Sequence, residues 1–198
     1  MILNIRKSCS RINFLQFSPP VFIKALNVGA IDEFKEPEDW AYVNYCGPAS
    51  TQVALRARTT NIPTLDQIGQ CELIDPSWGV YMSNVTPCLN SYLNTSFYWT
   101  DVASSPDVLW NWVKSDVDQG YAVLTGVYTP PMEGWNGHET YHIITLYGYD
   151  YSYQTTTEKM VNYVDTASEV AGYTGTYLNK VELSDLWSFV SPNNVQAW

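Results

Sequence analysis

The stretch Asn44-Tyr45-Cys46-Gly47-Pro48-Ala49-Ser50-Thr51-Gln52-Val53-Ala54-Leu55 has the pattern of a loop that enters a helix. Pro48 suits the first turn of a helix, and apolar residues recur at helical spacing from Ala49 to Val53. Cys46 is therefore expected at a helix N-terminus, where partial positive charge and unpaired N–H groups stabilise a thiolate. A small buried thiol without chemistry is the alternative interpretation of Cys46 alone.

The rest of the chain changes from helical to strand periodicity. Apolar spacing predicts further helices at about 82–94 and 105–120, and a short closing helix at about 184–190. Short segments rich in β-branched and aromatic residues predict strands at 121–128, 141–149, 160–164 and 177–181. Helices first and strands afterwards indicate an α+β domain.

Two histidines are available to serve a nucleophilic cysteine. His142 begins an apolar strand, and strand alternation directs it to the same face as Ile144 and Leu146. Cysteine chemistry needs an imidazole that takes and returns a proton, and a rigid strand would hold it in place. A core histidine bonded to a backbone carbonyl is the alternative. His138 lies in a Gly-rich loop, where solvent exposure is expected, and is the minor rival.

A third group is needed to orient the imidazole. Asp165 follows the strand at 160–164, and a carboxylate there is placed to accept the imidazole N–H and set its tautomer. The alternative for Asp165 is a turn-starting residue. Cys46, His142 and Asp165 together form the candidate catalytic set.

These motifs carry a family resemblance. The segment 45–50 at a helix start, the Leu89-Asn90 pair, His142 six residues before Gly148-Tyr149-Asp150, and Val164-Asp165 resemble the bacteriocin-processing-peptidase-like family of papain-type cysteine peptidases. The likeness spans about residues 40–190 and corresponds to the free-standing members, also described as double-glycine leader peptidase-like. It implies a papain-like α+β fold, a Cys-His-Asp set without metal or cofactor, and hydrolysis of peptide or protein substrates.

One position departs from the pattern of these peptidases. They usually carry a Gln about six residues before the nucleophile, whose amide helps to stabilise the oxyanion, whereas position 40 here is Trp. Asn44 is the candidate replacement donor, and a loop Asn that bonds nearby backbone is its alternative interpretation. Losing such a donor costs on the order of 10²–10³ in turnover.

Composition excludes several classes of function. The 198 residues suit one domain, and twenty acidic against ten basic side chains give a net charge of −10, which opposes nucleic-acid binding. No run of eighteen apolar residues exists, so no membrane-spanning helix is expected. Walker loops, dinucleotide fingerprints and paired zinc knuckles are also missing. We expect a monomer without cofactor.

The N-terminal region differs in charge from the remainder. Residues 1–31 contain four basic and no acidic side chains, and we interpret them as an extension or an atypical secretion signal before a peptidase domain at 32–198. Removal of this segment would take Cys9 with it, leaving Cys46 free and Cys71 with Cys88 as either a bridge or two thiols. A secreted or cell-surface location is expected, with the cytoplasm as the alternative.

Four functions remain compatible with this sequence. The first is a cysteine peptidase, and the second is acyl transfer to an amine by the same thiol. A cell-wall amidase is the third, although the motif around the cysteine is unusual for one. A non-catalytic binding module on the same scaffold is the fourth, and Trp40 is the residue that favours it.

Overall fold

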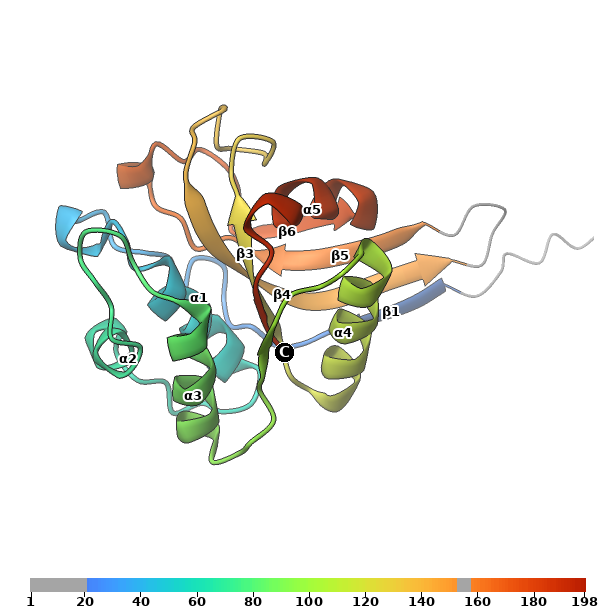
Figure 1. The fold of residues 1–198 in the computed structure, drawn as a ribbon, viewed down its shortest axis with the longest axis horizontal. Coiled ribbons are helices and arrows are strands. Elements are labelled where there is room, and N and C mark those ends of the chain that lie inside the picture. The colour runs from blue at the N-terminus through green and yellow to red at the C-terminus, as the bar shows by residue number, and fades with distance from the viewer. Residues whose placement is uncertain (1–20, 153–157) are drawn as a thin grey trace, which may run out of the picture.

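The computed structural model describes residues 21–152 and 158–198, and its elements confirm the predicted α+β class (Figure 1). The α-helices are α1 (Cys46–Arg56), α2 (Leu65–Cys71), α3 (Met82–Leu93), α4 (Pro106–Gln119) and α5 (Leu183–Val190). The strands are β1 (Val21–Ala25), β2 (Thr100–Asp101), β3 (Val123–Tyr128), β4 (Tyr141–Ser152), β5 (Lys159–Val164), β6 (Leu178–Glu182) and β7 (Gln196–Ala197). Short 3-10 turns are η1 (Trp40–Tyr42), η2 (Glu169–Ala171) and η3 (Ser191–Asn193).

The strands form one antiparallel sheet in the order β2-β7-β3-β4-β5-β6, with β1 added to β4. The long strand β4 organises this sheet. Its first half pairs with β3 from Tyr141 to Leu146, and its second half pairs with β1 from Gly148 to Ser152. Strand β5 lies along the opposite edge of β4. The candidate histidine therefore begins the central strand of the sheet.

Strand β1 corrects the expected character of the N-terminal segment. Residues 21–25 were expected to belong to an extension, but they pair with β4 over five positions. The apolar and aromatic stretch around Phe22 and Ile23 has the composition of an edge strand, and β4 is long enough to accept it. Residues 1–20 of the extension or signal segment expected at 1–31, with Cys9 among them, lie outside the described residues.

Helices cover both faces of the sheet. Alternate residues of β4 point to opposite faces, so Ile144 packs with α4 and α5, whereas Ile143 packs with α1, α2 and α3. Figure 1 shows α1, α2 and α3 grouped together at the left of the sheet. Within residues 21–152 and 158–198, no helix has both the length and the apolar character required to cross a bilayer.

The capping residues of α4 act as predicted. The Ser105 side chain accepts the Val108 N–H at the start of this helix, and Gly120 ends it with a positive φ of 86°. Helix α2 was not predicted. It has only seven residues, although Thr64 and Gln67 form a reciprocal capping box at its start.

One disulfide and one buried hydrogen bond hold α2 in place. Cys71 at its end is joined by a disulfide to Cys88 in α3, which decides between the two alternatives left open by the sequence. Glu72 follows Cys71, is fully buried, and accepts a hydrogen bond from the Thr51 hydroxyl of α1 at 2.5 Å. Burial raises the pKa of Glu72 to about 8, against the lowering effect of the Thr51 hydrogen bond. Glu72 is therefore mostly neutral at pH 7.

Removal of the disulfide is expected to destabilise the fold. The bridge spans 17 positions, and closing a loop of this length contributes roughly 3 kcal/mol by constraining the unfolded chain. We expect the Cys71→Ser/Cys88→Ser double variant to lose about 2–4 kcal/mol of unfolding free energy in denaturant titrations. Wild-type protein treated with a reductant is the control and should lose a similar amount. An unchanged denaturation midpoint in both would contradict this role.

Glu72 should make stability depend on pH. Between pH 4.5 and about 8 the folded protein holds a proton on Glu72 that the unfolded chain releases, so the unfolding free energy falls as pH rises. Glu72→Gln removes this contribution, and the slope of stability against pH should decrease by up to about 1.4 kcal/mol per pH unit.

Thermal unfolding at about pH 5 and about pH 9 measures this slope. Part of the pH dependence of stability is expected to remain in Glu72→Gln, because burial also raises the pKa of Asp116, in α4, to about 7. Asp66→Asn, an exposed change in α2, is the matched control. Equal slopes in the wild type and Glu72→Gln would show that Glu72 is not the titrating group.

Candidate active site

Cys46 is the first residue of α1, as the sequence predicts, and is half-buried. It is the free cysteine among residues 21–152 and 158–198. The next position has to be glycine, because a Cβ at Gly47 would lie 2.2 Å from Val80 Cγ1. The first turn of α1 is thus packed closely against the segment that precedes α3, and Cys46 lies half-buried at the start of the helix.

Ser50 connects this helix to the central strand. Its hydroxyl donates to the Ile143 carbonyl at 2.8 Å, and its carbonyl accepts the Thr145 hydroxyl at 3.0 Å. Both hydrogen bonds are buried, so they keep their strength away from water. They bring the start of α1, with Cys46, beside the start of β4, with His142.

His142 lies opposite Val127 in the β3–β4 pairing and is 4% exposed. Its position in the strand gives it the face of Ile144, as predicted, and Ile144 packs in the same core cluster as Trp135. The Trp135 ring lies 5.0 Å from the imidazole, measured between centroids. The imidazole is therefore held by packing as well as by hydrogen bonds.

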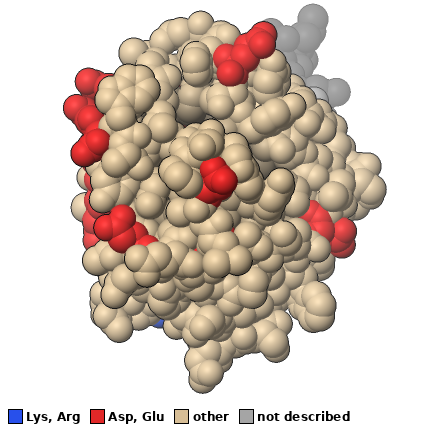
Figure 2. Space-filling view, turned by 60° about the vertical axis from the view of Figure 1, so that its left-hand side comes forward, with Lys and Arg blue, Asp and Glu red and all other residues tan. Residues whose placement is uncertain are grey.

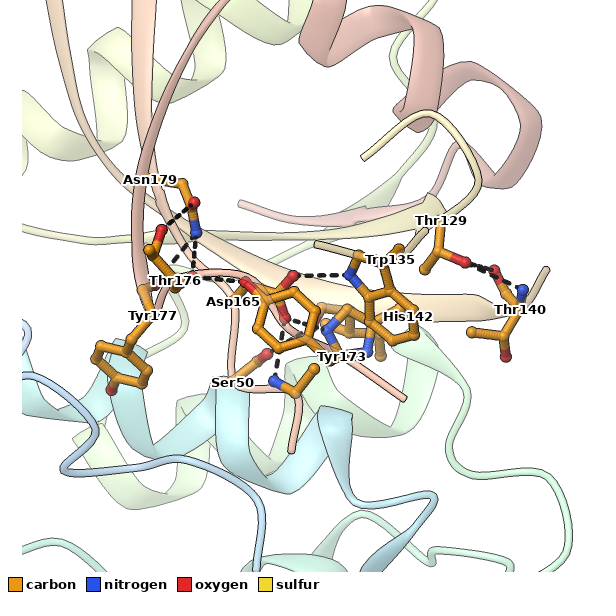
Figure 3. A network of polar contacts seen from close by, with 12 residues as sticks. Ser50, Thr129, Trp135, Thr140, His142, Asp165, Tyr173, Thr176, Tyr177 and Asn179 are labelled. Atoms are coloured by element: carbon orange, nitrogen blue, oxygen red, sulfur yellow. Dashed lines mark hydrogen bonds and ion pairs between the residues drawn. The ribbon is translucent and has the colours of Figure 1, made fainter. Parts of the chain in front are cut away.

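Asp165 lies just beyond β5 and is 1% exposed. Its Oδ1 is 2.9 Å from His142 Nε2 and also accepts the Ala167 N–H at 3.0 Å. Its Oδ2 accepts the Trp135 Nε1–H at 3.0 Å. Figure 3 shows Trp135 and His142 both directed toward the carboxylate of Asp165. Because Nε2 faces Asp165, Nδ1 is the ring nitrogen left to serve a thiol.

The charge state of His142 follows from these partners. Burial disfavours the charged ring and by itself would lower the pKa of His142. The charge of Asp165 and its hydrogen bond raise that pKa, and a hydrogen bond and charge interaction with Cys46 raise it further. The net pKa of His142 lies well above the usual 6.5, so the ring is protonated at neutral pH. A protonated imidazole beside a thiol is the arrangement that favours a thiolate.

Cys46 and His142 line one open cavity of about 470 Å³. Its wall combines the start of α1, the loop before α3, the loop before β4, and η2 and η3. Four of its aromatic side chains are exposed, namely Trp40, Trp78, Tyr81 and Tyr141. The cavity thus offers an aromatic mouth above the thiol and the imidazole. Within the described ranges, no three His, Cys, Asp or Glu side chains are grouped to hold a metal ion.

The remaining candidates from the sequence occupy the rim of this cavity. Trp40 is 76% exposed in η1 and carries no amide for an oxyanion. Asn44 lines the cavity, and its amide nitrogen donates to the Pro76 carbonyl at 2.6 Å. His138 is exposed and stacks near Trp135, with 6.2 Å between ring centroids. His142, and not His138, is the histidine that contacts Asp165.

Two residues of the site were missed in the sequence. Trp135 stands three residues before His138 in a loop, and nothing local indicates that its indole reaches Asp165, 30 positions away. Glu36 lies in an acidic, Pro-containing stretch that has the composition of an exposed turn, yet it is buried and lines the cavity. Neither residue has a spacing signal, because both act through contacts distant in the chain.

Comparisons with known proteins agree on the class of fold. A sequence model described as the Peptidase_C39 like family matches residues 25–191. No curated protein matches the chain in sequence. The crystal structure of UfSP from C. elegans superposes with a TM-score of 0.56 at 15% identity, covering 94% of this chain and 35% of that one.

The Amb a 11 cysteine protease, a major ragweed pollen allergen solved in its proform, gives a TM-score of 0.54 at 12% identity, covering 94% of this chain and 66% of that one. The chain therefore spans about a third of UfSP and just under two thirds of Amb a 11. At these identities the likeness concerns the fold, and the predicted papain-like α+β fold is confirmed.

Proposed function

The chain belongs to the Peptidase_C39 like family and has the fold of a cysteine-type peptidase, and from this premise we propose that it hydrolyses peptide bonds with Cys46 as the nucleophile. In this proposal His142 is the general acid and base, and Asp165 orients His142. The contact of 2.9 Å between His142 Nε2 and Asp165 Oδ1, together with the hydrogen bond between His142 and Cys46, carries the proposal.

The reaction follows from the charges at this site. The Cys46 thiolate adds to the scissile carbonyl carbon, and the electron pair of the C=O bond moves onto the oxygen. When that pair returns, the C–N bond breaks and the amine leaves with a proton from His142. Water then adds to the thioester carbon while His142 takes one of its protons. When the tetrahedral intermediate collapses, the C–S bond breaks, the acid product leaves, and the Cys46 thiolate is regenerated beside the protonated His142. Asp165 accepts the Nε2–H of His142 and stabilises the imidazolium whenever the ring is protonated.

The finer assignment is also a proposal. We place the chain with the relatives of the bacteriocin-processing peptidases, on the strength of the cysteine and histidine motifs. We also propose that it acts outside the cytosol. The Cys71–Cys88 disulfide supports this location, since such bridges persist in oxidising compartments and are rare in reducing ones.

Acyl transfer and a binding module remain the competing functions. Acyl transfer uses the same thioester and differs only in the acceptor, so its product is an amide of an added amine. A binding module needs no activated thiol. The protonated state of His142 beside Cys46 favours a reactive pair over a binding module.

Reactivity of the Cys46 thiol tests the proposal. If Cys46 and His142 form a reactive pair, a haloacetamide should alkylate Cys46 near pH 6–7 far faster than a free cysteine of pKa about 8.5. His142→Ala should lower this rate by more than about tenfold and abolish hydrolysis of a peptide library, because the thiolate loses its partner. Cys46→Ser should abolish both signals. Rates are measured by mass spectrometry of the modified peptide.

His138→Ala is the matched control, since His138 lines the same cavity but does not contact Asp165. Its alkylation rate should equal that of the wild type. A larger loss in His138→Ala than in His142→Ala would reverse the assignment of the two histidines. Rapid alkylation without hydrolysis, together with amide formation from an added amine, would establish acyl transfer instead.

Charge around the cavity indicates the kind of peptide that enters it. Of the Asp, Glu, Lys and Arg side chains described, Glu36 alone lines the cavity. Three exposed carboxylates are next in sequence to residues that line the cavity, namely Asp39, Glu139 and Glu169. Figure 2, which brings the left-hand side of Figure 1 forward, shows Asp and Glu scattered over this face and almost no Lys or Arg. This negative field attracts basic peptides, and the aromatic mouth offers faces for cation–π contacts.

A preference for basic peptides is therefore expected. At about 10 mM salt, kcat/KM for a peptide with Lys at positions flanking the cleaved bond should exceed that of its Glu analogue by roughly tenfold. The ratio should approach unity at about 1 M salt, where the field is screened. The Glu139→Gln/Glu169→Gln double variant should lower the ratio at low salt. A ratio independent of both salt and these two carboxylates would contradict electrostatic selection.

A further inference from the structure

Glu36 is a buried carboxyl group in the wall of the catalytic cavity. It is 6% exposed and lines the cavity together with Cys46 and His142. Its backbone N–H donates to the Thr166 carbonyl at 2.8 Å, which ties it to the residue that follows Asp165. The reaction outlined above gives Glu36 no role, although a buried carboxyl group without a role is costly to keep.

The surroundings of Glu36 favour the neutral acid. Burial raises the pKa of Glu36 to about 8, the protonated His142 of β4 opposes this rise, and the charge of Asp165 adds to it. From α1, Cys46 is the titratable side chain that lines the cavity together with Glu36. At pH 7 most molecules therefore carry a carboxylic acid at this position. Such a group has an O–H to donate, which a carboxylate lacks.

The oxyanion formed by attack of Cys46 needs such a donor. The backbone N–H of the nucleophile supplies one hydrogen bond, and a second donor is usual in acyl-transfer sites. Trp40 has no amide to give. Three other buried or half-buried side chains of the cavity each already give one N–H to a protein oxygen, and the indole of Trp135 has no second N–H to offer. Asn44 donates to Pro76, Asn193 to Val127, and Trp135 to Asp165.

Building on the proposed function, we propose that Glu36 is the second oxyanion donor, acting as a neutral carboxylic acid, and that its ionisation turns this donor off. As the bond between Cys46 Sγ and the carbonyl carbon forms, the C=O electron pair moves to oxygen and receives the Glu36 O–H hydrogen bond. No proton leaves Glu36. When the pair returns, the C–N bond breaks and the departing amine takes its proton from His142.

Three variants measured across pH test this role. Glu36→Gln keeps a neutral donor at every pH, Glu36→Leu has none, and Glu38→Gln changes an exposed carboxylate two residues away as the matched control. We expect Glu36→Leu to lose about 10²–10³ in kcat at pH 7 with KM little changed, because the bond strengthens only in the transition state. Glu36→Gln should retain kcat within a few-fold.

The pH profile separates catalysis from structure. In the wild type, kcat should fall above about pH 8 as Glu36 ionises. In Glu36→Gln this fall should move to higher pH, toward the loss of the His142 proton, whereas in Glu38→Gln it should stay in place. Alkylation of Cys46 by a haloacetamide creates no oxyanion, so its rate at pH 7 should be equal in all four proteins.

Each outcome decides one question. Normal alkylation with unchanged kcat in Glu36→Leu, or an unmoved alkaline fall in Glu36→Gln, would overturn the assignment of Glu36 and leave the cysteine peptidase intact. Slow alkylation and no hydrolysis in the wild type would instead overturn the proposed function, and the role of Glu36 with it. If Glu36→Leu does not fold, the profile of Glu36→Gln decides by itself.

Discussion

Ser50 joins α1 to β4 through two buried hydrogen bonds, one donated to the Ile143 carbonyl and one accepted from the Thr145 hydroxyl. Cys46 lies one helical turn before Ser50, and His142 directly precedes Ile143. The separation of thiol and imidazole is therefore set by a contact between two rigid elements and not by loops. Leaving one of these buried groups unpaired costs about 1–3 kcal/mol, so the helix and the strand stay in register.

The second requirement is a fully satisfied carboxylate behind the imidazole. Asp165 is buried, and its two oxygens accept hydrogen bonds from His142, Trp135 and Ala167. A buried charge with incomplete partners is strongly unfavourable, and these three donors keep Asp165 able to act on His142. Trp135 thus supports the candidate site although it has no reactive group, because its indole completes the partners of Asp165.

Buried carboxyl groups in this protein differ in the partners that surround them. Asp165 is paired with a positive ring and two N–H donors, whereas Glu36 and Glu72 are buried with few partners and have pKa values raised to about 8. Burial therefore favours the neutral acid at Glu36 and at Glu72. Environment, more than residue type, assigns these roles.

The sequence by itself determined the features that depend on close neighbours. Helical spacing and Pro48 predicted where α1 begins, Ser105 and Gly120 marked the ends of α4, and strand alternation gave the face of His142. Only the tertiary structure showed that β1 joins the sheet, and that Trp135 and Glu36 reach the site. Caps and periodicity act over a few residues, whereas burial and the pairing of charges depend on groups such as Trp135 and Asp165, which lie 30 positions apart.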